Sequence, residues 1–327
     1  MAFNIKDVAK RAEVSPATVS LALNGSELVN KETQKRVKKI AEEMGYKPNP
    51  YAQKLVLQKS RMIGLIIPDI TNVFYAVLVQ HVNNAVRKAG YGLYIAMSND
   101  STETEKTILE EMRNNRMEGI LLAPVNVTNN NPDYLHDFDI PLVFTTAGYP
   151  LIDKPCVMSD LENGMYFLTQ LLVERGRKNI AYITGQSEVY TLDLREKGFL
   201  RAISDINIKI FHNDNVSYKT ACCVTFEILN ADKKFDAVIC VNDMMAIGVV
   251  NTLLQHGIKI PEDIAVCGYD DVIFAEISPV PITTVIQDIE AIAIKSTEIL
   301  FSLIKGEKKN CDKNIIIKNE IIIRKSI

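Results

Sequence analysis

The sequence predicts a small all-α module followed by a larger α/β core of two Rossmann-like lobes, each built on a parallel sheet. Two observations lead to this fold class. Within the first 60 of the 327 residues, helix-capping residues alternate with apolar side chains at helical spacing. Beyond them, short and nearly continuous apolar runs alternate with amphipathic helical segments, which is typical of parallel sheets buried on both faces.

The first two helices are marked by their capping residues. Asn4 can cap the first, with Asp7 completing a capping-box-like arrangement three residues later. Ser15 can cap the second, because Pro16 suits the first helical position, where its missing N–H costs nothing. We expect the second helix to reach about Leu23 and to stop at Asn24-Gly25, which accept a left-handed conformation.

A third helix is expected after Asn30, ending at Gly45. Two short helices joined by a tight turn, with a third packed behind them, form a helix-turn-helix module, whose second helix enters the major groove of DNA. The second helix carries small side chains that allow a close approach. Its hydroxyls can bond to phosphates, and they belong to Ser15, Thr18 and Ser20. The alternative is a three-helix bundle without a ligand.

Charge is distributed unevenly along the chain. Residues 1–60 carry 11 Lys and Arg against 6 Asp and Glu, a balance of +5, so a whole-chain charge of −3 leaves −8 for residues 61–327. A basic module on an acidic core favours a polyanionic partner for the module alone. Clustering of charge on a solvated helix face is the alternative that charge by itself leaves open.

The segment "PNPYAQKLVLQKS", residues 48–60, is expected to be a linker with its own short helix. Asn49 and Pro50 offer a further cap and first helical position, but the helix could be only about two turns long and would be marginal alone. A helix that orders on binding, with Leu55 wedged into a minor groove, would explain its leucines. An ordinary hydrophobic linker packed on the next domain is the alternative.

In the core, helices are expected up to about residue 89 and near 104–116, 163–175, 194–204, 217–230, 243–256 and 289–305. They fall into two series, which predicts two lobes. Ligands of open α/β sheets bind at the carboxyl ends of the strands, here across a cleft between the lobes. The candidate residues at these ends are Asp69, Asn242, Asp243, Asp270 and Asp271, and they are joined by Arg195 and Phe74, which open helices of the second and the first lobe. Their alternative role is to cap helices or form ion pairs between the lobes.

Several segments together resemble the lactose repressor family of bacterial transcription regulators. They are "NIKDVAKRAEVSPATVSLALNG", "VNKETQKRVKKIAEEMGYKPNPYAQKL", "IGLIIPDITNVFY", "KNIAYITG", "LREKGF", "VICVNDMMAIGVV", "IPEDIAVCGYDD" and "PITTVIQD". The similarity covers essentially the whole chain in the family's order. It implies a DNA-binding headpiece, a hinge helix, a core of periplasmic-binding-protein type, and a homodimer that reads a pseudo-palindromic operator in double-stranded DNA.

The resemblance also implies roles for individual residues. Thr18, Ser20 and Asn24 match positions that contact the DNA backbone, and Pro16, Ala17 and Leu21 match base-reading positions. Leu55 matches the hinge leucine that enters the minor groove, and the hinge residues Asn49, Tyr51 and Ala52 complete the DNA-binding set. The effector contacts that the resemblance implies are Phe74, Arg195 and Asp270, with Phe74 stacking on a ligand that Arg195 and Asp270 hold. Asn242, from its strand end, completes the expected effector site.

Two positions depart from the family's common pattern. Many members carry arginine where this chain has Leu21, so the operator sequence does not carry over. Sugar-binding members often have an acid where this chain has Thr146, which argues against a simple hexose effector. A sugar-like or nucleoside-like effector, another small ligand, or none stays open, and so does control by a protein partner.

The domains expected are residues 1–48 (headpiece), 49–60 (hinge) and 61–327 (core). The first lobe is expected to comprise about 61–158 and 288–308, and the second about 159–285 and 312–327. The chain stops directly after "IIIRKSI", without a heptad segment, which favours a dimer over a tetramer.

Other function classes find little support in the sequence. The sequence contains no GxxxxGK[ST], HExxH or GxSxG motif, and its four histidines lack metal-ligand spacing, so neither an enzyme nor a cofactor or metal is expected. A sugar-binding enzyme is the alternative from another class. No run approaches the roughly 18 apolar residues of a membrane span, and "MAFNIKDVAK" lacks the apolar region of a signal peptide, so a cytoplasmic protein is expected. Six cysteines without a CxxC pair are expected to be reduced and structural.

Overall fold

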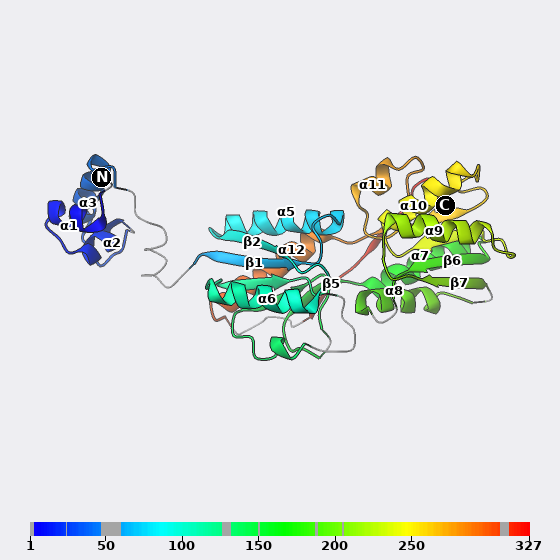
Figure 1. Ribbon diagram of the computed structural model, residues 1–327, viewed down its shortest axis with the longest axis horizontal. Coiled ribbons are helices and arrows are strands. Elements are labelled where there is room, and N and C mark those ends of the chain that lie inside the picture. Colours follow the sequence, from blue (N-terminus) through cyan, green and yellow to red (C-terminus); the bar gives the residue numbers. More distant parts are fainter. Residues whose placement is uncertain are drawn as a thin grey trace. The chain divides into compact units, whose positions relative to one another are not determined.

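The computed structural model describes residues 3–23, 25–46, 60–125, 132–149, 151–186, 189–204, 206–307 and 314–327. The chain forms two compact units, Met1–Ser60 (the first unit) and Arg61–Ile327 (the core). Within these ranges, no helix combines the length and the apolar character needed to cross a bilayer. Figure 1 shows the helices of the first unit and the strands and helices of the core.

The first unit contains α1 (Ile5–Ala12), α2 (Pro16–Leu23) and α3 (Lys31–Glu43). The capping box predicted at α1 is confirmed: the Asn4 side chain accepts from the N–H of Lys6 at 2.9 Å and of Asp7 at 3.3 Å, and the Asp7 carboxylate accepts from the N–H of Asn4 at 2.9 Å. Asn30 caps α3 by accepting from the N–H of Thr33 at 2.8 Å. Local sequence signals therefore set where these helices begin.

The α2 helix also begins and ends as the sequence predicts. The Ser15 hydroxyl accepts from the N–H of Thr18 at 3.1 Å, as an N-cap does. After Leu23 the chain reverses at Gly25, where φ is +70°, and the N–H of Ser26 returns to the carbonyl of Leu21 at 3.0 Å. The three helices pack around a small apolar interior of Val8, Ala9, Ala12, Val19, Ala22, Val29, Val37 and Ala41.

The first lobe of the core is built on a parallel sheet whose strands, among the described residues, lie in the order β11-β5-β4-β3-β1-β2. Helices α5 and α12 cover one face of this sheet, and α6 covers the other. The strands are β1 (Met62–Ile67), β2 (Gly92–Met97), β3 (Gly119–Leu122), β4 (Leu142–Thr145), β5 (Cys156–Ser159) and β11 (Asn314–Ile317). The helices are α5 (Val73–Lys88), α6 (Thr102–Asn114), the short 3-10 helix η1 (Asp133–Leu135) and α12 (Ile289–Ile304).

The second lobe has a smaller parallel sheet, with described strands in the order β7-β6-β8-β9, around one continuous apolar cluster. Its strands are β6 (Asn179–Thr184), β7 (Asn207–His212), β8 (Ala237–Cys240) and β9 (Ala265–Cys267). Its helices are α7 (Leu161–Glu174), α8 (Tyr190–Arg201), α9 (Tyr218–Leu229), α10 (Asp243–Gln255) and α11 (Ile273–Ile277). Both lobes therefore have the predicted α/β architecture with parallel sheets.

Three described segments join the lobes, and we call them the crossovers. They lie between β5 and α7, between β10 (Thr284–Ile286) and α12, and between β11 and β12 (Glu320–Ile322). β10 and β12 pair with each other in an antiparallel ribbon. Each change of lobe that the structure describes is therefore made by only one or two residues of chain.

The assignment of residues 312–327 to the second lobe is wrong for the first half of that segment. Strand β11 pairs in parallel with β5, at the edge of the first-lobe sheet. The chain enters the second lobe only after Ile317, and the Ser326 hydroxyl then donates to the carbonyl of Val266 at 2.5 Å. Both "NIII" and "EIII" are apolar enough to form a strand. The lobe to which each belongs depends on the strand with which it pairs, and that strand lies far away in the sequence.

The sequence carries only a weak signal for two strands of the core, β5 and β7. β7 is largely exposed along its length at the edge of the second-lobe sheet, so it lacks the continuous apolar pattern of a buried strand. β5 has only four residues, "CVMS". Cys156, Cys222, Cys223, Cys240 and Cys267 are free thiols, and Cys311 lies outside the described ranges.

Close packing of α7 against α8 yields a prediction about Gly198. A Cβ at this position would overlap the backbone carbonyl oxygen of Glu162 in α7. Backbone cannot rotate away as a side chain can, so we expect Gly198→Ala to destabilise the core by about 1–3 kcal/mol or more in urea unfolding. Lys197→Ala on the exposed side of α8 is the control and should stay within about 0.5 kcal/mol. Equal stability of the two variants would contradict this packing.

A buried carboxylate in α6 holds together two loops of the first lobe. Glu105 is fully buried. It accepts from the N–H of Val125 at 2.9 Å and from the hydroxyls of Tyr134 at 2.8 Å and Tyr149 at 3.4 Å. Burial raises the pKa of Glu105, and the three hydrogen bonds only partly oppose that shift.

The raised pKa predicts how the stability of the core depends on pH. A folded state that binds this proton more tightly than the unfolded chain is favoured below the unfolded pKa of about 4.3, and the advantage is lost as pH rises through the folded pKa. The free energy of unfolding of the natural protein, measured relative to Glu105→Gln, should therefore fall as pH rises above about 4.3. Parallel pH profiles from urea titrations of the two proteins would contradict the shift.

Candidate functional site

The outward surface of α2 is uncharged and carries small or apolar side chains. Ser15, Pro16 and Ala17 are exposed, and Leu21 has 37% of its surface exposed, whereas Val19 and Ala22 are fully buried. The hydroxyls of Ser15 and Thr18 are hydrogen-bonded to each other at 2.8 Å. The face predicted to meet DNA is thus exposed at Ser15, Pro16, Ala17 and Leu21 and half-buried at Thr18 and Ser20, and two of its hydroxyls are oriented by a mutual bond.

Positive charge in the described part of the first unit lies on α1 and α3, not on α2. All of these lysines and arginines are exposed, and Arg11 lies 3.7 Å from Glu43 in an exposed ion pair. They are Lys6, Lys10, Arg11, Lys31, Lys35, Arg36, Lys38 and Lys39. Such charges attract phosphate without reading sequence. The charges that attract phosphate therefore lie on α1 and α3, whereas the small side chains that allow close approach to DNA lie on α2.

Five residues of the predicted DNA-binding set lie outside the described residues. They are Asn24, Asn49, Tyr51, Ala52 and Leu55. The other six, Ser15, Pro16, Ala17, Thr18, Ser20 and Leu21, all lie on α2 or at its start.

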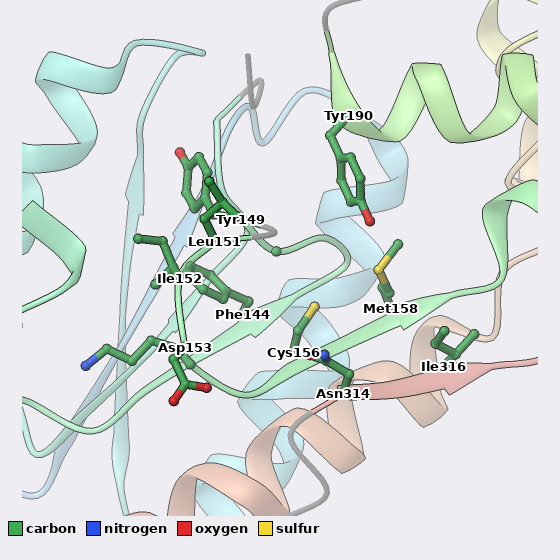
Figure 2. A pocket seen from close by; sticks show the side chains of 12 residues that line it. Phe144, Tyr149, Leu151, Ile152, Asp153, Cys156, Met158, Tyr190, Asn314 and Ile316 are labelled. Atoms are coloured by element: carbon green, nitrogen blue, oxygen red, sulfur yellow. The ribbon is translucent and has the colours of Figure 1, made fainter. Parts of the chain in front are cut away.

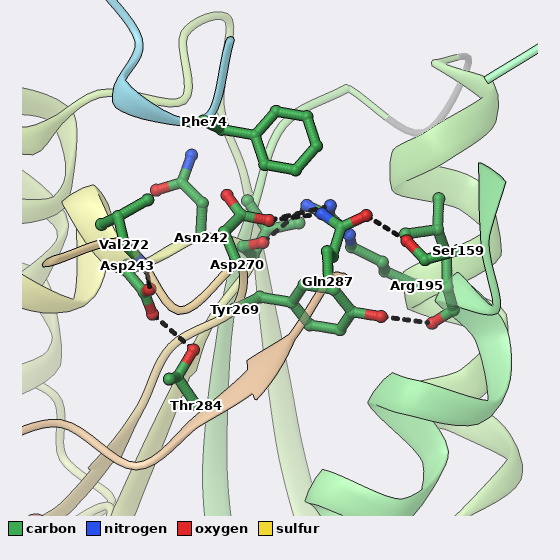
Figure 3. Close-up of polar contacts among 12 residues, drawn as sticks. Phe74, Ser159, Arg195, Asn242, Asp243, Tyr269, Asp270, Val272, Thr284 and Gln287 are labelled. Atoms are coloured by element: carbon green, nitrogen blue, oxygen red, sulfur yellow. Dashed lines mark hydrogen bonds and ion pairs between the residues drawn. The ribbon is translucent and has the colours of Figure 1, made fainter. Parts of the chain in front are cut away.

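In the core, Arg195 and Asp270 form a buried ion pair with 3.3 Å between Nη2 and Oδ1. Arg195 comes from α8, and Asp270 follows β9 at the carboxyl end of the second-lobe sheet. Arg195 also donates through Nη1 to the carbonyl of Val241 at 2.7 Å, and its guanidinium lies 4.2 Å from the ring centre of Tyr269. Figure 3 shows this group of side chains, with Phe74 of the first lobe facing it.

One donor of this cluster is left over. The Nε of Arg195 is buried and has no hydrogen-bond partner among the residues that the structure describes. A buried donor of this kind costs roughly 1–3 kcal/mol unless something else accepts its hydrogen. Burial raises the pKa of Asp270, while Arg195 and the hydrogen bond from Gln287 act in the opposite direction. The cluster is therefore both desolvated and incompletely satisfied.

Asn242 and Phe74 lie beside this pair. Asn242 caps α10 by accepting from the N–H of Met245 at 2.9 Å, and Figure 3 shows its amide nitrogen turned towards Phe74. The Phe74 ring is almost buried and meets that of Tyr75 edge to face, with 5.3 Å between ring centres. All four side chains predicted to contact an effector thus come together.

Two other strand-end candidates have partners within the second lobe. Asp243 is fully buried and accepts from the Thr284 hydroxyl at 2.6 Å and from the N–H of Val272 at 2.9 Å. Asp271 pairs with Arg324 at 2.7 Å. Both carboxylates therefore fasten loops at the sheet edge.

Sequence reasoning missed the residues that connect the cluster to the crossovers. Gln287 donates to Asp270 at 2.6 Å and accepts from the Ser159 hydroxyl. Asn319 donates to the Tyr269 hydroxyl at 2.6 Å and to the carbonyl of Asp160 at 3.0 Å. Asp160, Gln287 and Asn319 lie in three different crossovers, so all three crossovers take part in these hydrogen bonds. A polar side chain next to an expected change of lobe is the signal that could have identified them.

Strained backbone also concentrates just after the carboxyl ends of strands β2, β4 and β9. Five of the non-glycine residues with positive φ lie within four residues of the end of a strand, and each costs of order 1–3 kcal/mol. They are Asn99, Asp100, Thr146, Asp270 and Asp271, with φ between +50° and +107°. The surrounding structure holds them in place at the expense of stability, a pattern that accompanies binding sites.

A pocket of about 300 Å³ lies elsewhere in the core (Figure 2). The strands β4, β5 and β11, the loop around Tyr149 and the α8 residue Tyr190 line it, and none of the four predicted effector contacts does. Burial raises the pKa of its Cys156 thiol to about 12, so this thiol is protonated at neutral pH. The described His, Cys, Asp and Glu side chains form no group suited to a metal ion.

Known protein families match parts of both the first unit and the core. The family described as bacterial regulatory proteins, lacI family, matches residues 4–49, and a periplasmic binding protein-like domain matches residues 169–327. The HTH-type transcriptional repressor PurR of Histophilus somni (strain 129Pt) is 30% identical over 332 residues, covering 99% of this chain and 98% of that protein.

Two solved structures are also similar. The lac repressor dimer bound to operator and the anti-inducer ONPF has a TM-score of 0.87 at 23% identity and covers 100% of this chain and 99% of that one. The transcriptional regulator CelR in complex with cellobiose has a TM-score of 0.72 at 25% identity, with 99% of each chain covered. A regulator, rather than the alternative of an enzyme, is thereby confirmed. The chain belongs to the lacI family of bacterial regulatory proteins and is a DNA-binding transcriptional regulator.

Proposed function

We propose that this regulator is a dimeric repressor whose affinity for its operator is switched by a small molecule held between Phe74 and the Arg195–Asp270 pair. The observation that carries the proposal is the buried Nε of Arg195, which has no hydrogen-bond partner within the described ranges of the chain. A ligand oxygen that accepts its hydrogen would remove a desolvation cost that the free protein bears.

The DNA-binding half of the proposal assigns a part to each element of the first unit. Helix α2 enters the major groove, where Thr18, Ser20 and Asn24 contact the backbone and Pro16, Ala17 and Leu21 meet base edges. The lysines and arginines of α1 and α3 supply attraction to phosphate. In the hinge, Leu55 would enter the minor groove, and Asn49, Tyr51 and Ala52 would support it.

The switch is proposed to act through the crossovers. A ligand that bonds to Arg195 and Asp270 competes with the existing hydrogen bonds of the pair, including the one from Gln287. Because Gln287 is also bonded to Ser159, this competition bears on two crossovers at once. Coupling free energies between sites of this kind are typically ~1–3 kcal/mol.

The effector we propose is sugar-like or nucleoside-like. An aromatic ring above an arginine–aspartate pair suits a ligand with a flat or ring-shaped body and several hydroxyl or amide groups. Thr146 rather than an acid lies at the end of β4, which disfavours a simple hexose.

Exposed apolar side chains support the proposed homodimer. Edge strand β2 exposes Tyr94, Ile95 and Met97, each more than 40% accessible. In the second lobe, α11 exposes Ile273 and Ile277 at 57% and 65%. An edge strand with an apolar surface is a liability unless another chain covers it. The pseudo-palindromic operator would match the two-fold symmetry of such a dimer, and the cytoplasm and nucleoid are the proposed location.

Removal of the first unit tests the DNA-binding half. Because residues 61–327 form a compact unit of their own, we expect this fragment to unfold cooperatively and yet to lose all binding to DNA fragments selected with the full chain. Fluorescence anisotropy measures binding, and circular dichroism controls for folding. Retention of tight, sequence-dependent binding by the fragment would contradict the assignment.

A thermal-shift screen of sugars, nucleosides and phosphorylated metabolites tests the switch. A ligand at 100 times its Kd should stabilise the core by about 2.7 kcal/mol, and Asp270→Asn should abolish the shift. Asp271→Asn is the matched control, because Asp271 also pairs with an arginine but is not a proposed contact. Equal responses of the two variants would remove Asp270 from the site.

A regulator controlled by a protein partner is the second candidate, and the same screen separates it. If no compound shifts the transition of the core, the small-ligand proposal loses its support. Partner capture with the full chain then becomes the informative experiment.

A further inference from the structure

We propose that this protein recognises thymine through its C5-methyl group, and that Leu21 makes the contact. The inference rests on the proposed entry of α2 into the major groove and specifies the base chemistry that α2 reads.

The first step is the chemical inventory of α2. From Val14 to Leu23 the sequence contains no charged and no amide side chain. Hydrogen-bond readout of guanine uses Arg or Lys, that of adenine uses Asn or Gln, and that of cytosine uses Asp or Glu. The helix therefore lacks every side chain that forms these specific pairs.

The hydroxyls of α2 do not replace them. Ser15 accepts from the N–H of Thr18 and is also bonded to the Thr18 hydroxyl at 2.8 Å, so much of their capacity is used within the helix. Ser20 is half-buried, and a serine hydroxyl can both donate and accept, so it discriminates poorly between bases.

The second step is the position of Leu21. Leu23, two residues further on, packs against the interior of the first unit, as do Val14 and Ile40, but Leu21 is not part of that cluster. Leu21 is 37% exposed, whereas Val19 and Ala22 of the same helix are fully buried and Leu23 is half-buried. Leu21 thus presents apolar surface outward, on the face that it shares with Ala17, four residues earlier.

The third step is the chemistry of the groove. The thymine methyl is the apolar group that an unmodified base pair offers in the major groove. An outward leucine gains by removing that methyl from water, whereas it leaves the polar edge of a G·C pair without partners. Leu21 should therefore select for thymine and against guanine.

The test uses a binding site selected from random DNA with the full-length protein. Each dT of that site is replaced in turn by dU, which removes only the methyl. At the position that Leu21 contacts, we expect about fourfold weaker binding, the equivalent of ~0.8 kcal/mol for one buried carbon. At the same position, 5-methyl-dC in place of dC should bind better than dC, because it brings the methyl group back on a different base.

Protein variants assign the effect to one side chain. Leu21→Ala should bind the dT and dU sites equally at that position. Leu28→Ala is the matched control, because Leu28 is a leucine with 85% exposure outside α2, and its dT/dU ratio should equal that of the natural protein. Leu21→Arg should shift the selected sites towards guanine.

The outcomes separate this inference from the role on which it rests. If no site is enriched from random DNA, the proposed docking of α2 fails. If sites are enriched but dU binds as well as dT at every position, or if Leu21→Ala keeps the natural dT/dU ratio, docking stands and methyl recognition by Leu21 is overturned.

Discussion

The ion pair of Arg195 and Asp270 is the contact around which the polar cluster at the carboxyl end of the second-lobe sheet is organised. Both side chains are about nine-tenths buried, so removing either one would leave a charge in a poorly hydrated place. Gln287 and Tyr269 connect the pair to all three crossovers. The proposed ligand contacts and the crossovers therefore depend on one set of side chains, so a ligand at the pair would act on the crossovers as well.

The helices of the first unit could be predicted closely because their signals are local. Asn4, Ser15 and Asn30 bond to backbone within three residues, so sequence spacing alone identifies them. Strand pairing is different in kind. Whether "NIII" at β11 joins β5 or the second lobe depends on a partner more than 150 residues away, and no local pattern contains that information.

The residues of the candidate site also differ in whether local sequence or long-range contacts identify them. Asn242 and Asp270 could be predicted, because the carboxyl ends of parallel strands are known sites for ligands. Gln287 and Ser159 could not, since they are 128 positions apart and meet only where two crossovers run together. The exposed surface of Leu21 was predictable from helical periodicity, whereas its exclusion from the apolar interior needed the packing of all three helices.

The interior of the first unit has a thermodynamic consequence. Its buried apolar residues, among those that the structure describes, are all valine or alanine, so little apolar area is removed from water when this unit folds. Units of this size are marginally stable for that reason. Anything that binds only the folded form adds to its stability by mass action. Binding to DNA should therefore stabilise the fold of this unit. On heating without DNA, the first unit should unfold before the core.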